Sequence, residues 1–166
     1  MVKESRIVLL LLMAAVLLIQ ESRAGEKNQL RWMTFNDGIA EARKTGKKVM
    51  IDVYTDWCGW CRKMDKDTYA DGGIADYLNK KYVAIKLDAE SGNKLQYRGK
   101  SYTEQDLAGE FGISGYPSII FLKDDGEPIT VYPGYADPAK FRIVLSYIAD
   151  DHYKTTKFQD FLNRKE

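Results

Sequence analysis

The only two cysteines of this 166-residue chain lie two residues apart, in the segment Trp57-Cys58-Gly59-Trp60-Cys61. A structural disulfide stabilises a protein mainly by closing a long loop, and a two-residue spacer closes almost none. The spacing therefore favours redox chemistry, in which the pair is alternately oxidised and reduced, over a structural cross-link.

The residues around the pair predict a strand before it and a helix after it. Residues 49–54 form an apolar run interrupted only by Asp52, and residues 62–70 suit a helix. Cys58 would then lie at a helix N-terminus, where unpaired N–H groups favour an anion and lower a thiol pKa from about 8.5 toward about 3.5–7.5. We expect Cys58 to attack a disulfide and Cys61, one helical turn on, to resolve the mixed disulfide.

Half of a zinc site is the main alternative for such a cysteine pair. A structural zinc needs four protein ligands, and beyond Cys58 and Cys61 the chain has no cysteine and only one histidine, His152. The sequence therefore predicts no metal and no bound cofactor besides the cysteine pair itself.

The N-terminus is typical of a secretory signal. Lys3 and Arg6 precede an apolar run at 7–19, and small residues suit cleavage between Ala24 and Gly25. Thirteen helical residues span roughly 20 Å, less than the roughly 30 Å of a hydrocarbon core, which favours a cleaved signal at 1–24 over a membrane anchor. Since exported thiols meet an oxidising compartment, a reductant there needs a supply of electrons.

Composition limits the partners and the number of domains. The formal net charge is +1, with 25 basic and 24 acidic residues, which gives no case for nucleic acid or an anionic membrane as partner. Residues 25–166 suffice for a single domain. We expect its core at about 35–150, followed by a short C-terminal helical extension, and a monomer.

The hydrophobic pattern predicts strands and helices in alternation. Strands are expected at 49–54, 82–88, 118–122 and 129–132, the last two joined by a turn at Asp125-Gly126. Helices are expected from a cap at Asn36 to Gly46 and at 62–70, 74–78, 103–111, 137–148 and 158–162. Residues 90–102 lack periodicity and are expected to form an irregular surface loop. The order predicts an α/β fold, a mixed sheet covered by helices on both faces, ending in an antiparallel hairpin and a helix.

This pattern resembles the thioredoxin superfamily, whose Trp-Cys-Gly-x-Cys site lies on a strand-to-helix turn; the resemblance covers about residues 35–148. Gly115-Tyr116-Pro117 looks like that family's loop with a cis proline. Residues 47–61 are similar to the C-terminal periplasmic domain of the bacterial thiol:disulfide interchange protein, and residues 121–135 with 153–162 resemble exported thioredoxins of sulfur-oxidation gene clusters. The resemblance implies a thioredoxin fold, a periplasmic or secreted protein, and a membrane-embedded thiol donor of electrons.

Asp52 and Lys86 are candidate catalytic residues besides the cysteines. A carboxyl buried in an apolar strand has a raised pKa and can accept the proton of Cys61 during resolution; the alternative is an acid on a solvated strand face. The family resemblance implies that Lys86 corresponds to the lysine that pairs with this acid in thioredoxins. The alternative is a lysine that extends its charged end into solvent.

The candidate substrate-binding residues are Trp57, Gly59, Trp60, Tyr116 and Pro117. The resemblance implies a cis bond before Pro117, which would leave Tyr116 main-chain groups free to pair with an extended substrate. The two tryptophans flank the sulfurs and can form an apolar surface on which a substrate binds. The alternative is that one of them is a core residue, and Trp57 is then expected to be that residue.

The direction of exchange rests on Trp60. In the thioredoxins that this chain resembles, the position of Trp60 holds a proline, and in disulfide isomerases or strong oxidants it usually holds a histidine. Because Trp60 lacks a histidine's charge, we expect a reductant of disulfides in other exported proteins. The alternatives are an oxidase or isomerase with the same cysteines, and a non-enzymatic module that binds extended peptides along the Tyr116-Pro117 edge.

Overall fold

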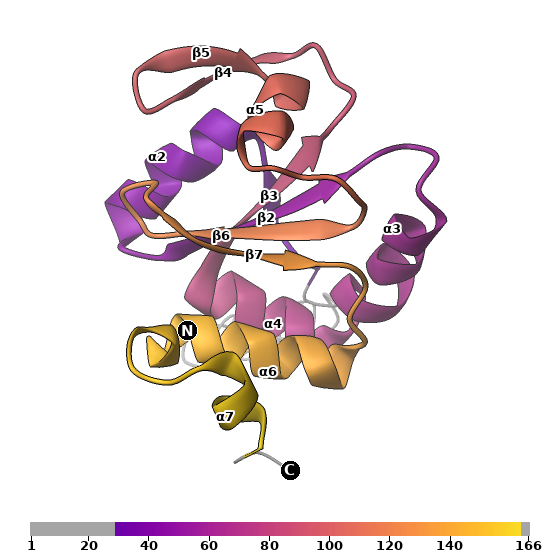
Figure 1. The fold of residues 1–166 in the computed structure, drawn as a ribbon, viewed down its shortest axis with the longest axis vertical. Helices are drawn as coiled ribbons and strands as arrows, with labels where there is room; N and C mark the ends of the chain where they lie inside the picture. Colours follow the sequence, from indigo (N-terminus) through magenta and orange to yellow (C-terminus); the bar gives the residue numbers. More distant parts are fainter. Residues whose placement is uncertain (1–28, 164–166) are drawn as a thin grey trace, which may run out of the picture.

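The computed structural model describes residues 29–163. A five-stranded sheet in the order β1-β3-β2-β6-β7 forms its centre (Figure 1). The strands are β1 (Trp32–Met33), β2 (Lys48–Tyr54), β3 (Tyr82–Asp88), β6 (Ser118–Leu122) and β7 (Pro128–Pro133). The first three run parallel, whereas β6 and β7 are antiparallel to their neighbours, so the predicted mixed sheet and its closing hairpin are confirmed. The predicted signal at 1–24 lies outside the described residues.

Helices cover both faces of this sheet, as predicted. The helices are α2 (Phe35–Thr45), α3 (Gly59–Met64), the π-helix η1 (Asp65–Tyr69), α4 (Gly72–Lys81), α5 (Glu104–Glu110), α6 (Pro138–Ala149), the 3-10 helix η2 (His152–Lys154) and α7 (Phe158–Leu162). One buried cluster joins the sheet to α2 and α5, and a second joins it to α3, η1, α4 and α6. None of the helices within residues 29–163 is long and apolar enough to cross a membrane.

Alternation along β2 decides which side chains face the redox helix. Val49, Ile51 and Val53 enter the cluster with α2, whereas Met50 enters the cluster with α3 and η1. Successive side chains of a strand point to opposite faces, so Asp52 shares the face of Met50. The carboxyl of Asp52 is thereby directed toward the layer that carries the cysteine motif.

The capping signals set most helix boundaries where the sequence predicts them. Thr103 and Asp106 form a reciprocal capping box on α5, and Asp137 caps α6 with Pro138 at its first position. The cap predicted at Asn36 is wrong, because the N-cap of α2 is Thr34, two residues earlier. Asn36 lies inside the helix, and its side-chain amide makes two hydrogen bonds to the main chain of Gln96.

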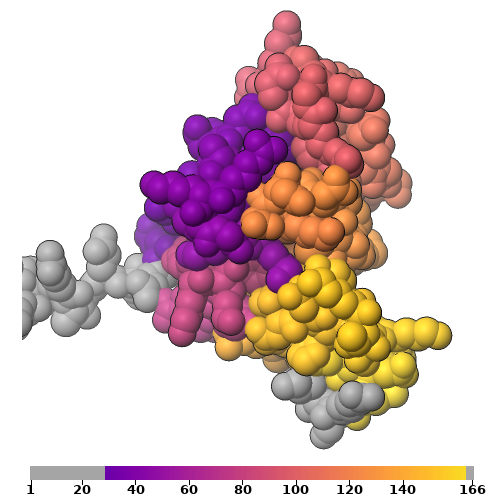
Figure 2. Space-filling view, turned by 90° about the vertical axis from the view of Figure 1, so that its left-hand side faces the viewer, coloured from indigo at the N-terminus to yellow at the C-terminus, as the bar shows by residue number. Residues whose placement is uncertain are grey.

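The prediction of an irregular loop at 90–102 is wrong from residue 94 onward, where a two-stranded hairpin forms. Its strands are β4 (Lys94–Tyr97) and β5 (Lys100–Thr103), joined by a turn in which Arg98 and Gly99 have positive φ angles of 50° and 78°. Leu95 and Tyr97 are buried and alternate with exposed neighbours. The hairpin and the C-terminal segment, shown in red and yellow, lie at opposite ends of the molecule (Figures 1 and 2).

Candidate active site

Cys58 and Cys61 form a disulfide at the start of α3. Cys58 is the N-cap of this helix, and its Sγ accepts a hydrogen bond of 3.0 Å from the main-chain N–H of Cys61. Cys58 thus lies at a helix N-terminus as predicted, although α3 begins at Gly59, three residues before the predicted 62–70, and the Cys61 N–H points at the sulfur that becomes a thiolate on reduction. Both cysteines are largely buried, which leaves a small approach to the disulfide for a partner sulfur.

Hydrogen bonds hold the turn between β2 and α3. The N–H of Cys58 donates to the carbonyl of Thr55, at 3.1 Å, and Arg62 Nη1 donates to the carbonyl of Asp56, at 2.7 Å. Gly59 is the first residue of α3, and a Cβ at this position would meet only the Arg62 side chain, at 3.9 Å. The structure thus gives Gly59 room for a side chain and shows no steric need for glycine there.

An aromatic rim surrounds the disulfide on its solvent side. Trp57 and Trp60 are 64% and 58% exposed, so the expectation that Trp57 is a core residue is wrong. Trp57 belongs to the turn beyond the end of β2 and not to the sheet, and its Nε1 donates to Glu90 Oε1 at 2.9 Å. The ring of Trp60 lies 5.4 Å from that of Tyr135, a rim residue that the sequence reasoning did not select.

The loop before β6 lies beside this rim. The Tyr116–Pro117 peptide bond is cis, as the resemblance implies, and the Tyr116 ring meets the Trp57 ring edge-on with 5.9 Å between centroids. The Ser118 hydroxyl donates to the carbonyl of Gly115 at 2.7 Å and fixes the loop. Residues 112–118, with Val131, Pro133 and Gly134, line a groove of about 290 Å³.

Asp52 and Lys86 form a buried ion pair behind the motif. The two residues are direct partners in the register of β2 and β3, and Lys86 Nζ lies 2.7 Å from Asp52 Oδ2. The Asp52 side chain is 1% exposed, so the alternative of an acid on a solvated strand face is wrong; the Lys86 side chain is half-buried, with 23% exposed. Burial raises the pKa of Asp52 above its ordinary value, although Lys86 works in the opposite direction.

A second carboxylate, which the sequence reasoning missed, shares the same lysine. Lys86 Nζ lies 2.5 Å from Asp65 Oδ1. Burial alone would lower the pKa of Lys86, but Asp52 and Asp65 outweigh it and leave that pKa raised. The ammonium also lies 4.8, 5.0 and 5.5 Å from the ring centroids of Trp32, Tyr54 and Tyr69.

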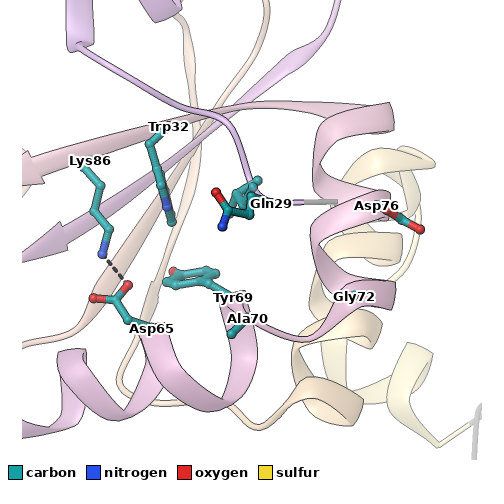
Figure 3. A pocket seen from close by; sticks show the side chains of 9 residues that line it. Gln29, Trp32, Asp65, Tyr69, Ala70, Gly72, Asp76 and Lys86 are labelled. Carbon is teal, nitrogen blue, oxygen red and sulfur yellow. Dashed lines mark hydrogen bonds and ion pairs between the residues drawn. The ribbon is translucent and has the colours of Figure 1, made fainter. Parts of the chain in front are cut away.

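Lys86 and Asp65 line one wall of a recess of about 710 Å³ between β3, η1 and α4 (Figure 3). Trp32, Asp65, Tyr69 and Lys86 face it together, although they come from three different elements, β1, η1 and β3. Asp52 Oδ1 and the Tyr69 hydroxyl are both buried, and each influences the protonation of the other. Burial also raises the pKa of Tyr69, so its hydroxyl stays protonated beside the Asp52 carboxyl.

Within residues 29–163 no group of three histidine, cysteine, aspartate or glutamate side chains is arranged to hold a metal ion. The chemistry that the site offers is that of the cysteine pair: a sulfur nucleophile at a helix N-terminus, a second sulfur one turn on, and a buried carboxylate on the strand that leads into the motif.

Comparisons with known proteins agree with this geometry. A family model described as a thioredoxin-like domain matches residues 35–149. The thiol:disulfide interchange protein DsbD of Actinobacillus pleuropneumoniae is 31% identical over 85 residues, which are 51% of this chain and 13% of that protein. The protein disulfide-isomerase of Hordeum vulgare is 33% identical over 92 residues, covering 55% of this chain and 15% of that protein.

Solved structures show the same fold. A thioredoxin from Thermus thermophilus superposes with a TM-score of 0.59 at 24% identity, covering 72% of this chain and 87% of that one. A thioredoxin-fold protein from Helicobacter pylori gives a TM-score of 0.60 at 20% identity, covering 88% and 92%. The predicted thioredoxin fold is confirmed, and oxidoreductases of this fold work through their cysteine pair without an external cofactor. With its matched domain and its Cys58–Cys61 disulfide, the chain belongs to the thioredoxin-like family of thiol-disulfide oxidoreductases.

Proposed function

We propose that this protein is an exported oxidoreductase that reduces disulfides in other exported proteins. The observation that carries the proposal is the placement of the Cys58–Cys61 pair, capped by helix N–H groups on one side and rimmed by exposed tryptophans on the other. A thiolate at such a helix N-terminus is stabilised and remains open to a partner.

The reaction runs in two exchange steps. The reduced Cys58 thiolate attacks one sulfur of a substrate disulfide, forming a mixed disulfide and releasing a substrate thiolate that takes a proton from water. Cys61 then gives its thiol proton to Asp52 and attacks the Cys58 sulfur, so that the Cys58–Cys61 disulfide forms and the second substrate sulfur leaves as a thiolate, which takes a proton from water. Two electrons pass from the cysteine pair to the substrate.

The exposed rim supports a protein as substrate. Trp57, Trp60 and Tyr116 present apolar surface around the disulfide, and the groove beside Pro117 has room for an extended segment. Aromatic side chains are the groups that protein interfaces favour. A monomer that receives substrates one at a time fits this open face.

The direction of exchange is supported by the residue between the cysteines. Trp60 carries no charge, and its ring packs against Tyr135 and contributes no hydrogen bond to the sulfurs. No group in the motif therefore favours the thiolate strongly enough to make the pair a strong oxidant. The similarity to a plant protein disulfide-isomerase keeps isomerisation, by the same cysteines, as the second candidate function.

Export is supported by the apolar run at 7–19 and the small residues before Gly25. In an oxidising compartment the pair needs a dithiol partner that re-reduces it after each cycle. A membrane-embedded thiol donor, of the kind implied by the similarity to the interchange protein, would supply those electrons. The chain spans only 13% of the length of that relative, so the donor is part of the proposal.

A trapping experiment tests the function. The reduced protein is mixed with insulin, whose interchain disulfides precipitate the B chain when they are cleaved. We expect reduction by the parent protein, none above background by Cys58→Ser, and accumulation of a mixed disulfide by Cys61→Ser, visible on a non-reducing gel. Full insulin reduction by Cys58→Ser would contradict the role of Cys58, and absence of reduction by the parent protein would contradict the proposed function and favour a peptide-binding module.

A further inference from the structure

Lys86 is shared by two carboxylates that differ sharply in their exposure. Its Nζ lies 2.7 Å from Asp52 Oδ2 and 2.5 Å from Asp65 Oδ1. The Asp52 side chain is 1% exposed, whereas that of Asp65 is 47% exposed. The lysine therefore bridges a buried acid on β2 to an acid at the surface, and only the buried acid lies behind the cysteine motif.

Asp65 lies where α3 passes into the π-helix η1. This π-helix continues α3 directly, and the N–H of Ala70 donates to the carbonyl of Asp65, which closes the wider turn. Asp65 and Tyr69 both face the recess beside Lys86 (Figure 3). Asp67, in the same turn, pairs with Lys63 on the outside of the molecule instead.

The charges around the pair do not balance. Tyr69 from η1 and Tyr54 from β2 face Lys86, and burial raises the pKa of both phenols, so both are neutral near pH 7. Trp32 from β1 adds an uncharged ring, and Asp76 from α4 lines the same recess. Besides Cys61 in the reduced state and the Asp76 carboxyl, the groups that remain are one ammonium, Lys86, and the two carboxylates that contact it, Asp52 and Asp65. One positive charge cannot neutralise both carboxylates fully.

We propose that Asp65 is a positioning residue for thiol exchange: by holding one side of the Lys86 ammonium, it leaves Asp52 incompletely neutralised and therefore able to take up the proton of Cys61. This inference rests on the proposed function, because it gives Asp65 a role in the resolving step. In that step the proton moves from the Cys61 thiol to the Asp52 carboxylate while the Cys61 sulfur bonds to the Cys58 sulfur and the substrate sulfur leaves as a thiolate, which is protonated by water. Asp52 later returns the proton to water.

The physical basis is the effect of a second anion on a shared cation. If Asp65 lost its charge, Lys86 would interact with Asp52 alone and would stabilise the ionised Asp52 more strongly. The negative charge of Asp65 also repels that of Asp52 and raises its pKa, in the same direction as burial does. Removing the Asp65 charge should therefore make Asp52 a weaker base.

A titration of Asp52 itself tests this role without requiring any enzymatic activity. The carboxyl-carbon NMR signal of Asp52 is followed against pH in the oxidised protein and assigned with Asp52→Asn. We expect Asp65→Asn to lower the midpoint of Asp52 by about one pH unit. The matched control is Asp67→Asn, which removes a carboxylate from the same turn but not from Lys86, and should leave the midpoint unchanged. An unchanged or raised midpoint in Asp65→Asn would overturn the inference.

Two further measurements separate charge from shape and the inference from the proposed function. Asp65→Glu keeps the charge and should keep the parent midpoint; a fall as large as that of Asp65→Asn would show that the shape of the site sets it and would overturn the inference. The acid limb of the pH profile for mixed-disulfide resolution should move to lower pH in Asp65→Asn, with a plateau rate about two- to fivefold lower. A shifted midpoint in a protein that fails to reduce insulin would refute the function while leaving the electrostatic role of Asp65 intact.

Discussion

The two sides of the Cys58–Cys61 disulfide are built in opposite ways. On the solvent side Trp57 and Trp60 are exposed, and they are the only large hydrophobic side chains of the described region that are. On the interior side Asp52 is buried together with most of Lys86. Globular proteins generally bury large apolar groups and keep charges in water, so this site reverses the usual arrangement on both sides.

The reversal teaches which side performs which task. An exposed indole gains free energy when a partner covers it, so the outer side suits recognition. Burial raises the pKa of the Asp52 carboxyl, which makes it a better proton acceptor than an exposed carboxylate, so the inner side suits proton transfer. Each side departs from what stability alone would select, and such departures are expected at functional sites.

Removing the buried acid on the inner side should change the reaction rate more than any change on the outer side. We expect Asp52→Asn to slow resolution of the mixed disulfide by about 100-fold near pH 7, because Cys61 loses its proton acceptor. The first attack by Cys58 should change much less. Rapid mixing of the reduced variant with a disulfide substrate, quenched with acid, separates the two steps. Equal slowing of both steps would show that Asp52 supports the whole site and does not serve resolution.

The same variant should change how stability depends on pH. Because the folded-state pKa of Asp52 is raised, the folded protein holds this proton at pH values where the unfolded chain has lost it. The free energy of unfolding of the parent should therefore fall, relative to that of Asp52→Asn, as pH rises from about 4 through the folded pKa. Urea unfolding at a series of pH values measures the difference, and a constant difference would contradict a raised pKa.

Trimming the outer side should have a smaller and different effect. We expect Trp60→Ala and Trp57→Ala each to raise KM for a protein disulfide by about three- to tenfold with little change in kcat, since the apolar landing surface is reduced. Reduction of a small disulfide such as hydroxyethyl disulfide, which does not cover the rim, is the control and should be unaffected. An equal loss with both substrates would place the tryptophans in the chemistry instead.

The parts of the site that the sequence predicted are those with local signals. Cys58 could be placed at a helix N-terminus because an apolar run precedes the motif and a helical pattern follows it. Asp52 could be predicted as buried because apolar residues flank it on both sides in the strand. The Asp52–Lys86 contact depends on the register of two separate strands, which residue pattern alone does not set, and only the family resemblance indicated it.

The residues that were missed depend on long-range geometry or on a signal passed over. The contact of Asp65 with Lys86 joins η1 to β3, elements far apart in the sequence, and the residue types at 65–69 do not predict it. The β4–β5 hairpin did carry a signal, since Lys94-Leu95-Gln96-Tyr97 alternates polar with apolar residues before Gly99. The alternative of a core position for Trp57 is wrong because a hydrophobic side chain is not always buried. Trp57 lies in a turn beyond the sheet, and its ring is exposed to water.

The equilibrium reduction potential of the Cys58/Cys61 pair tests the central claim most directly. The protein is equilibrated with dithiothreitol or glutathione buffers of graded ratio, and the fraction of free thiol is measured after acid quenching and alkylation. A reductant without a charged group between its cysteines should give a value near about −270 mV, the thioredoxin end of the range. A value near about −120 mV would contradict the account and make the protein an oxidant of newly exported chains.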